Sequence, residues 1–373
     1  MADCVISGTG LWVPDEAISN AELVASLSQA VERWNLEHKA EIEAGTLEER
    51  DLPSERFIVK ASGVEQRYVI DKEGVLDPER LRPHLPTRTE NEPSIQCEIA
   101  VAAIEQALDQ AGRRPDEVDA VLVACSNLQR AYPAVAIEVQ HALGASGWAY
   151  DLNVACSSAT FGIQAAVDAV ARGNARCAVV VNPELTSAHN NFELRDYHFI
   201  FGDACTAAVI EPADAARAAA PFEILDTRLR TQFSNNIRND FGFMNRCEDE
   251  PRDAFELVFR QNGRKVFREV CPMVAEQITT QLGDLGLDPQ DVRRMWLHQA
   301  NLSMNQFIAK AVLGRPAEAD EAPVILDEFA NTSSAGSVIA FHRYRDDLAS
   351  GDLGVLCSFG AGYSIGSVVV RRV

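Results

Sequence analysis

An internal repeat restricts the fold of this chain more than any other feature of its sequence. The segments 108–127 and 282–301 place Leu, Gly, Pro, Val and Asn at the same spacing. Two later matches occur in the same order: Ser157-Ser158 with Ser333-Ser334, and Phe201-Gly202 with Phe359-Gly360. Three matches in one order indicate a duplicated unit about half as long as the chain.

Apolar runs and helical patterns alternate along the sequence. The runs 118–124, 149–154 and 177–181 are short and continuous, which predicts buried strands. Between the last two, residues 157–172 carry apolar side chains at helical spacing and end at Gly173, which predicts a helix. This alternation predicts an α/β fold in which mainly parallel strands are covered by helices.

The repeat also predicts two domains. The first is expected to span 1–213 and the second 214–373, with the alanine-rich stretch 211–221 as the joint. Two segments do not fit the repeat: 29–55 is charged and helix-prone, and 77–93 contains four prolines. We expect both to be surface additions, which commonly shape entrances or interfaces.

Charge and composition exclude several functions. Against 34 Lys and Arg stand 55 Asp and Glu, a net charge of −21 that disfavours nucleic acid or an anionic membrane as partner. No apolar run approaches the roughly 18 residues of a membrane span, and the start lacks the basic region of a secretory signal. Nine cysteines without CxxC spacing disfavour disulfides and a zinc site, and are expected mostly as core residues in a reducing cytoplasm.

Cys156 differs from the other cysteines by its position. It lies between the predicted strand 149–154 and the predicted helix 157–172. A helix N-terminus favours the thiolate, although its dipole contributes only about 0.3–1 kcal/mol, so a second contribution is needed. The alternative is a buried apolar cysteine at the end of a strand.

His298 and Asn331 occupy comparable positions in the second half. His298 ends the apolar run 295–297, and the carboxyl ends of strands are where open α/β sheets carry chemistry. Asn331 follows the run 324–329, predicted as a strand, and precedes a helix start. The alternatives are a hydrogen-bonded core histidine and a helix N-cap. By the repeat, the turn of Asn331 corresponds to that of Cys156, so we expect the two turns to meet across a pseudo-twofold axis.

Two glycine-containing segments are candidates for ligand-binding loops. Phe359-Gly360-Ala361-Gly362 follows the predicted strand 354–358, and its backbone N–H groups could approach a ligand as an oxyanion hole requires; the alternative is a tight turn. Gly8-Thr9-Gly10 lacks the third glycine of a dinucleotide loop, which disfavours a nucleotide cofactor there.

Taken together, these motifs resemble β-ketoacyl-ACP synthase III of the thiolase superfamily over nearly the whole chain. The most specific are DLNVACSSATFG around Cys156, FGDA at Phe201, HQAN at His298 and NTSSAGS at Asn331. The resemblance implies a five-layer αβαβα fold made of two duplicated halves. It also implies a Cys/His/Asn site formed by Cys156, His298 and Asn331, with the backbone amides of Cys156 and Ala361 as the oxyanion hole.

The resemblance further implies a decarboxylative Claisen condensation in fatty acid biosynthesis. Cys156 would take an acyl group from acyl-CoA, and malonyl-ACP would lose CO2 and attack the acyl-enzyme as an enolate, giving β-ketoacyl-ACP. His298 and Asn331 would donate hydrogen bonds to that enolate. No cofactor or metal is implied; the partners are acyl-CoA, acyl carrier protein and a second subunit in a cytoplasmic homodimer.

The positions that bind CoA depart from the usual pattern. Phe57 stands where the family has a tryptophan that stacks on the adenine, while Arg195 and Asn301 match other CoA-binding positions. Because the pattern is altered and the addition 29–55 lies just ahead of it, we expect a primer of roughly six to ten carbons. Arg264, Lys265 and Arg268 are similar in position to the face that docks the carrier protein; the alternative is a solvated helix.

Other functions remain open from the sequence. A thiolase needs a second cysteine where this chain has Phe359, with Cys357 two residues earlier. Hydroxymethylglutaryl-CoA synthases and enzymes that join two acyl-CoAs need a carboxylate base, and the corresponding loop Ser126–Pro133 has none. A cysteine hydrolase with the same three residues and a non-catalytic acyl-binding protein are the further alternatives.

Overall fold

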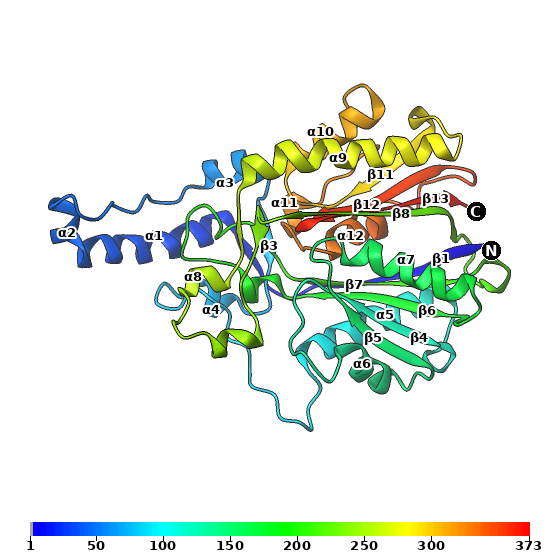
Figure 1. The fold of residues 1–373 in the computed structure, drawn as a ribbon, viewed down its shortest axis with the longest axis horizontal. Helices are drawn as coiled ribbons and strands as arrows, with labels where there is room; N and C mark the ends of the chain where they lie inside the picture. Colours follow the sequence, from blue (N-terminus) through cyan, green and yellow to red (C-terminus); the bar gives the residue numbers. More distant parts are fainter. Residues whose placement is uncertain (1–2) are drawn as a thin grey trace.

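The computed structural model describes residues 3–373, and they form five layers (Figure 1). Three of the layers are helical. The two outer helical layers are α9 (Gly263–Asp284) with α10 (Leu302–Leu313), and α5 (Ile95–Ala111) with α6 (Val135–Leu143). The middle helical layer is α7 (Ser158–Ala171) with α12 (Ala335–Arg343). Strands fill the two layers between them, so the predicted αβαβα arrangement is confirmed. No helix within residues 3–373 is long and apolar enough to cross a membrane.

The strands of both halves join in one nine-stranded sheet, ordered β11-β12-β13-β8-β1-β7-β6-β4-β5 within the described residues. The first half supplies β1 (Cys4–Trp12), β4 (Ala120–Ala124), β5 (Trp148–Leu152), β6 (Ala178–Glu184) and β7 (Ala204–Pro212). The second half supplies β8 (Phe222–Ser234), β11 (Val292–Leu297), β12 (Leu353–Gly360) and β13 (Gly362–Arg372). Strand β1 pairs with β8 over Cys4–Ile6, which links the two halves.

Strand directions are more mixed than the sequence predicted. Strands connected through helices pair in parallel, as in β4 with β5, β4 with β6, and β11 with β12. The central strands pair antiparallel: β12 with β13, β13 with β8, β8 with β1, β1 with β7, and β7 with β6. The expectation of mainly parallel strands therefore fails at the centre, because β12 and β13 are joined by a tight turn and not by a crossover helix.

The duplicated unit is visible as a repeated order of elements. In each half a long helix, α5 or α9, is followed by a short 3₁₀ turn at Pro115–Glu117 or Pro289–Asp291 and then by a buried parallel strand, β4 or β11. The Phe-Gly pairs precede β7 in the first half and β13 in the second. The repeat in the sequence therefore corresponds to a repeat in the order of secondary-structure elements.

The strand predicted at 324–329 is not formed. Residues Leu326–Phe329 make the short helix α11 instead. Ile325 before it has φ −124° and ψ 4°, which is not extended, and Glu328 within it accepts hydrogen bonds from Arg343 and Tyr68. The apolar run is buried by packing against the body and not by joining the sheet, which apolar content alone does not distinguish.

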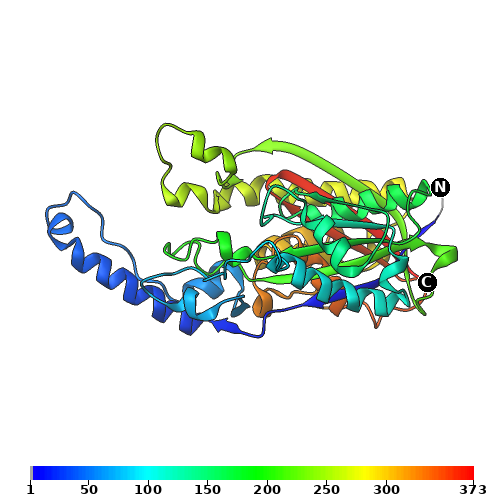
Figure 2. The ribbon, with the colours of Figure 1, turned by 90° about the horizontal axis from the view of Figure 1, so that it is seen from below.

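The segments 29–55 and 77–93 lie outside the layers. Helix α1 (Asn20–Glu37) begins at a capping box formed by Ser19 and Glu22, and with α2 (Lys39–Glu43) it makes an arm that projects from the body (Figures 1 and 2). Residues 77–93 are without helix or strand. The remaining elements are β2 (Ala17–Ser19), α3 (Glu55–Ser62), β3 (Gln66–Tyr68), α4 (Lys72–Leu76), β9 (Ile237–Arg238), α8 (Ala254–Leu257) and β10 (Arg260–Gln261).

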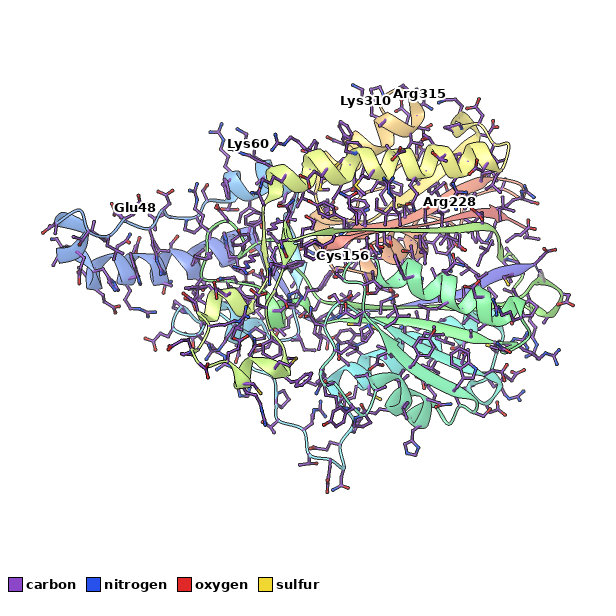
Figure 3. All side chains as sticks on the ribbon, viewed as in Figure 1. Glu48, Lys60, Cys156, Arg228, Lys310 and Arg315 are labelled. Carbon is purple, nitrogen blue, oxygen red and sulfur yellow. The ribbon has the colours of Figure 1, made fainter. Side chains whose placement is uncertain are left out.

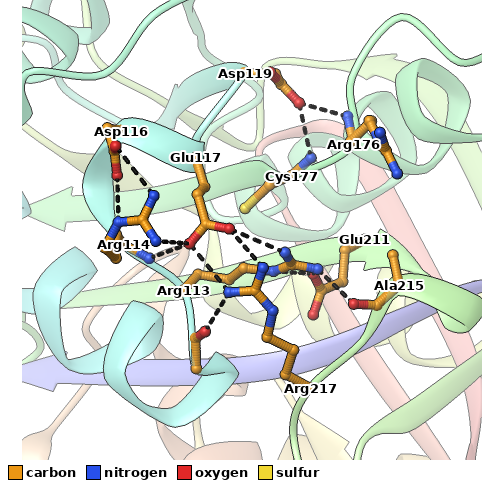
Figure 4. Close-up of polar contacts among 11 residues, drawn as sticks. Arg113, Arg114, Asp116, Glu117, Asp119, Arg176, Cys177, Glu211, Ala215 and Arg217 are labelled. Carbon is orange, nitrogen blue, oxygen red and sulfur yellow. Dashed lines mark hydrogen bonds and ion pairs between the residues drawn. The ribbon is translucent and has the colours of Figure 1, made fainter.

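Ion pairs connect the joint between the halves to the end of α5, and one of them is buried (Figure 4). Arg113 Nε donates to Glu211 at 2.7 Å, and Glu211 is fully buried near the end of β7. Arg217 in the joint pairs with Glu117 at 2.7 Å. These contacts lie at the far end of β7 from its first residue, Ala204, which pairs with the last residue of β6.

Candidate active site

Cys156 occupies a tight turn between β5 and α7, in the middle of the molecule (Figure 3). The preceding Ala155 has φ 47°, a left-handed conformation that residues with a Cβ rarely adopt. Hydrogen bonds hold the turn: Ala155 N donates to Asn153 Oδ1 at 2.9 Å, and Ser157 N donates to Val154 O at 3.1 Å. The turn places Cys156 two residues before the first residue of α7, with the N-cap Ser157 between them.

Gly360, at the end of β12, packs against this turn. A Cβ at position 360 would lie 2.7 Å from the Cβ and 3.2 Å from the Sγ of Cys156, closer than side-chain carbons approach. Glycine is therefore required here by contact with Cys156. The neighbouring Ala361 lines a separate surface hollow together with Val154 and Ala155.

His298 follows β11, and its backbone N donates to Cys357 O at 2.8 Å. Its ring is buried and stands edge-on to the ring of Phe359, 5.2 Å between centroids. Burial lowers the pKa of His298 to about 3, against the opposing effect of a hydrogen bond to the backbone of Ser333. The imidazole is therefore neutral at physiological pH. Its Nδ1 is buried and has no hydrogen-bond partner among residues 3–373.

Asn331 is held by its backbone and by one side-chain atom. Its N donates to Ile200 O at 3.0 Å, and its carbonyl accepts from Gly202 N at 3.1 Å. Its Oδ1 accepts from Ser333 N at 2.9 Å, so the amide Nδ2 is the side-chain group left to donate to a ligand. The N-cap of α12 is Ser334, so the alternative reading of Asn331 as that cap is wrong.

Ser333 connects all three predicted residues, and the sequence reasoning missed it. Its Oγ donates to Cys156 Sγ at 3.4 Å, its backbone bonds His298, and its N bonds Asn331. Its φ of 50° is again left-handed. The only signal in the sequence was its place in the repeat beside Ser334, where the matching first-half serine follows the cysteine.

The three predicted residues line one pocket of about 1040 Å³. Its wall is largely apolar and aromatic, and includes Phe57, Tyr197, Phe199, Phe201, Phe259 and Phe267. Charged and polar side chains such as Asp196, Arg264 and Arg268 also line it, and a mainly apolar wall with some polar groups is the usual composition of a ligand site. The two halves of the duplication thus meet where the repeat predicted.

The thiol of Cys156 is less acidic than its position suggested. Burial raises its pKa to about 11, the hydrogen bond from Ser333 lowers it, and the charge of the buried Glu184 raises it. The helix end therefore does not by itself make a thiolate in the protein without ligand, and the second contribution expected from the sequence is still needed. The dipole is a small effect, and loss of hydration outweighs it.

The predicted CoA contacts are only partly brought together. Phe57 and Asn301 line the pocket. The guanidinium of Arg195 lies 4.6 Å above the Phe57 ring and also pairs with Asp51 of the addition 29–55 at 2.8 Å. Asn301 caps α10 by accepting from Ser303 N at 2.9 Å, and its amide donates to Ala61 O.

The predicted docking residues are exposed in the first turns of α9. Arg264 and Arg268 line the pocket, while Lys265 lies beside them on the surface. Their helix begins at the cap Asn262, whose Oδ1 accepts from Lys265 N at 3.2 Å. Across the described chain, no group of three His, Cys, Asp or Glu side chains is arranged to hold a metal ion.

Two family models match the chain. The family model described as 3-oxoacyl-[acyl-carrier-protein (ACP)] synthase III matches residues 150–232, which include Cys156. Its C-terminal counterpart matches residues 282–372, which include His298 and Asn331.

Individual relatives cover nearly all of the chain. A β-ketodecanoyl-[acyl-carrier-protein] synthase of Pseudomonas aeruginosa is 57% identical over 347 residues, 93% of this chain and 99% of the relative. A β-ketoacyl-[acyl-carrier-protein] synthase III of Granulibacter bethesdensis is 28% identical over the full length of both. The crystal structure of 3-oxoacyl-(acyl carrier protein) synthase III from P. aeruginosa has a TM-score of 0.74 at 23% identity, covering 99% of this chain and 98% of that one.

Proposed function

Because the chain belongs to the β-ketoacyl-ACP synthase III family of condensing acyltransferases, we propose that it extends a medium-chain acyl primer through an acyl-Cys156 intermediate. The observation that carries the proposal is that Cys156, His298 and Asn331, from different halves of the chain, line one largely apolar pocket. Both substrates, acyl-CoA and malonyl-ACP, are thioesters that this family uses without a cofactor.

Cys156 is the proposed nucleophile. Its sulfur attacks the acyl-CoA carbonyl, CoA leaves as a thiol, and the acyl group remains as a thioester on the enzyme. The backbone N–H groups of Cys156 and Ala361 would stabilise the oxyanion in this step. Exchange of one thioester for another is nearly thermoneutral, so a small fraction of thiolate is sufficient.

His298 and Asn331 are the proposed donors for decarboxylation. Loss of CO2 from the malonyl group places negative charge on its thioester oxygen. The neutral imidazole of His298 has one N–H, which would donate to this oxygen in place of the backbone of Ser333. The Oδ1 of Asn331 accepts from Ser333 N, which leaves its Nδ2 to donate to the same oxygen. Donors aimed at this oxygen stabilise the enolate, which then attacks the acyl-Cys156 carbonyl.

The medium-chain preference rests on the pocket wall and on the name of one relative. The aromatic residues along the pocket offer apolar contact that an acetyl group is too short to use. The 57% identical relative is a β-ketodecanoyl synthase, and a ten-carbon product requires an eight-carbon primer plus two carbons. We infer that octanoyl-CoA is a better primer for this chain than acetyl-CoA.

Phe57, Arg195 and Asn301 are proposed to receive the CoA part of the primer, and Arg264, Lys265 and Arg268 to dock the acidic carrier protein. A homodimer in the cytoplasm is part of the same proposal. The homodimer is supported by β5, which lies at the edge of the sheet and could pair with a second copy. Exposed apolar side chains occur on this strand and on the segment before it, namely Tyr132, Ile137 and Tyr150.

A cysteine hydrolase is the second candidate from the residues alone, and the two differ in a measurable way. Intact mass after mixing with octanoyl-CoA should show an adduct on the wild-type protein and none on Cys156→Ala. Labelled malonyl-ACP should then discharge the adduct with release of CO2, and kcat/KM should be larger for octanoyl-CoA than for acetyl-CoA. Turnover to free octanoate without CO2 release would favour the hydrolase, and equal or higher kcat/KM for acetyl-CoA would refute the chain-length proposal.

A further inference from the structure

Glu184 is a fully buried carboxylate that the proposed mechanism does not use. It ends β6, has 0% of its surface exposed and is not part of the pocket wall. Ion pairs found in the described part of the chain do not include it; burial raises the pKa of its carboxyl, and the hydrogen bonds from Ser126 and Ser334 oppose that effect. A buried carboxylate in this state is costly unless its oxygens are fully occupied.

The donors to Glu184 come from both halves of the chain. From the first half, Ser126 N donates to Oε1 at 3.0 Å and Ser126 Oγ to Oε2 at 2.6 Å. From the second half, Ser334 N donates to Oε1 at 3.2 Å, and Ser334 Oγ donates to the same oxygen. The carboxylate therefore ties the loop after β4 to the residue that begins α12.

The hydrogen bonds between Glu184 and Ser334 fix one end of the Asn331–Ser334 turn, which contains a candidate catalytic residue. Ser334 directly follows Ser333, whose hydroxyl contacts Cys156 and whose backbone bonds both His298 and Asn331. With two left-handed residues, Ala330 and Ser333, the turn departs from ordinary backbone geometry and needs external support. At its amino end the turn is supported by the backbone hydrogen bonds of Asn331 with Ile200 and Gly202. At its carboxyl end it is supported by the hydrogen bonds that Glu184 accepts from Ser334.

We propose that Glu184 is a positioning residue, which fixes the Asn331–Ser334 turn against Cys156 by accepting the hydrogen bonds of Ser334 and Ser126. Its role rests on the proposed function of that turn. Glu184 does not touch substrate and transfers no proton. It supplies acceptor oxygens at a place where a neutral acceptor of the same length also fits, because serine hydroxyls rotate to donate or accept.

Two substitutions of Glu184 distinguish the effect of its acceptor oxygens from the effect of its negative charge, and a control at another site accounts for general loss of stability. Glu184→Met keeps the length of the side chain but removes both acceptors, whereas Glu184→Gln keeps an oxygen for the backbone N–H groups. Glu211→Gln is the matched control, since Glu211 is also fully buried in the first half but bonds Arg113 at the far end of β7 (Figure 4).

For Glu184→Met we expect kcat to fall at least about tenfold per folded protein, with KM for each substrate changed less than about threefold. Glu184→Gln should restore kcat to within about threefold of wild type, and Glu211→Gln should keep the wild-type kcat. If Glu184→Met does not fold, Ser334→Ala removes one donor with less disruption and should lower kcat about threefold or more. Equal losses in the Met and Gln variants, or a wild-type kcat in Glu184→Met or in Ser334→Ala, would overturn the proposal.

Hydrogen–deuterium exchange gives a second readout that does not depend on the reaction. Backbone amides of residues 331–337 should exchange faster in Glu184→Met, or in Ser334→Ala, than in wild type, and at the wild-type rate in Glu184→Gln. Unchanged exchange in the first two variants would refute the tie. If the wild-type protein forms no acyl adduct and releases no CO2, the proposed function fails, while the exchange result still decides whether Glu184 fixes the turn.

Discussion

Ser333 Oγ lies 3.4 Å from Cys156 Sγ, although the two residues are 177 positions apart in the chain. The contact crosses from the second half of the duplication to the first. It also joins two turns that each contain a left-handed residue, Ala155 in one and Ser333 in the other. The hydroxyl stabilises the charged form of the thiol and opposes the effect of burial.

Ser333→Ala should therefore slow the reaction of the thiol with electrophiles. A hydrogen bond to a charged group contributes about 1.5–3 kcal/mol, and a sulfur acceptor is weaker, so we expect roughly a tenfold loss of thiolate. The measurement is the rate of Cys156 alkylation by iodoacetamide at pH 8, followed by peptide mass spectrometry. An unchanged rate would show that the hydroxyl does not support the thiolate.

The reactivity of Cys156 should rise with pH without a plateau near neutrality. Its pKa is about 11, so the thiolate fraction increases about tenfold per pH unit between pH 7 and pH 9. His298, with a pKa of about 3, stays neutral over this range and adds no further step. A pH profile of alkylation in the absence of CoA tests this. A plateau above pH 6 would instead indicate a thiolate–imidazolium pair.

Substitution of Asn331 should separate the two half-reactions. Asn331→Ala should keep acyl-adduct formation but lose about a hundredfold in CO2 release, the size expected for one lost oxyanion donor. His298→Ala should lose at least as much CO2 release, with a smaller loss of acylation. Adduct mass and labelled CO2 are measured on the same samples. Normal CO2 release by Asn331→Ala, or no acylation in either variant, would contradict the assigned roles.

Reversing the charge of the α9 surface should weaken carrier docking. Arg264→Glu with Arg268→Glu should raise KM for malonyl-ACP more than KM for acyl-CoA, because like charges oppose an acidic carrier, and added salt should reduce the difference. Lys310→Glu with Arg315→Glu, at the end of α10, is a charge-matched control (Figure 3). Equal effects on both substrates, or an equal effect of the control, would place the docking surface elsewhere.

Gly360→Ala should disturb Cys156 specifically. The added Cβ would fall 2.7 Å from Cys156 Cβ, and overpacking of this kind costs about 1–3 kcal/mol. We expect a lower Tm and a loss of acylation of at least about tenfold. Gly283→Ala inside α9, where a Cβ meets nothing within 4 Å, is the control and should keep both values. Wild-type acylation in Gly360→Ala would show that the turn tolerates the displacement.

Much of the fold was readable because its signals are local or repeated. The helix 157–172 and the strands around 118–124 and 177–181 were predicted within a few residues of α7, β4 and β6. Continuous apolar runs mark strands that are buried on both faces. The same signal misled at 324–329, where the apolar residues are buried without joining the sheet.

The sequence by itself determined the duplication, the order of elements in each half, and the meeting of the Cys156 and Asn331 turns. It could do so because a repeat specifies two similar units, and the corresponding turns of these units are in contact in the structure. Only the tertiary structure decided the antiparallel centre of the sheet, the contact of Ser333 with Cys156 and the tie through Glu184. These depend on distances between side chains far apart in the chain. The thiol pKa is likewise decided by burial, because hydration is lost only when the packed layers close around the site.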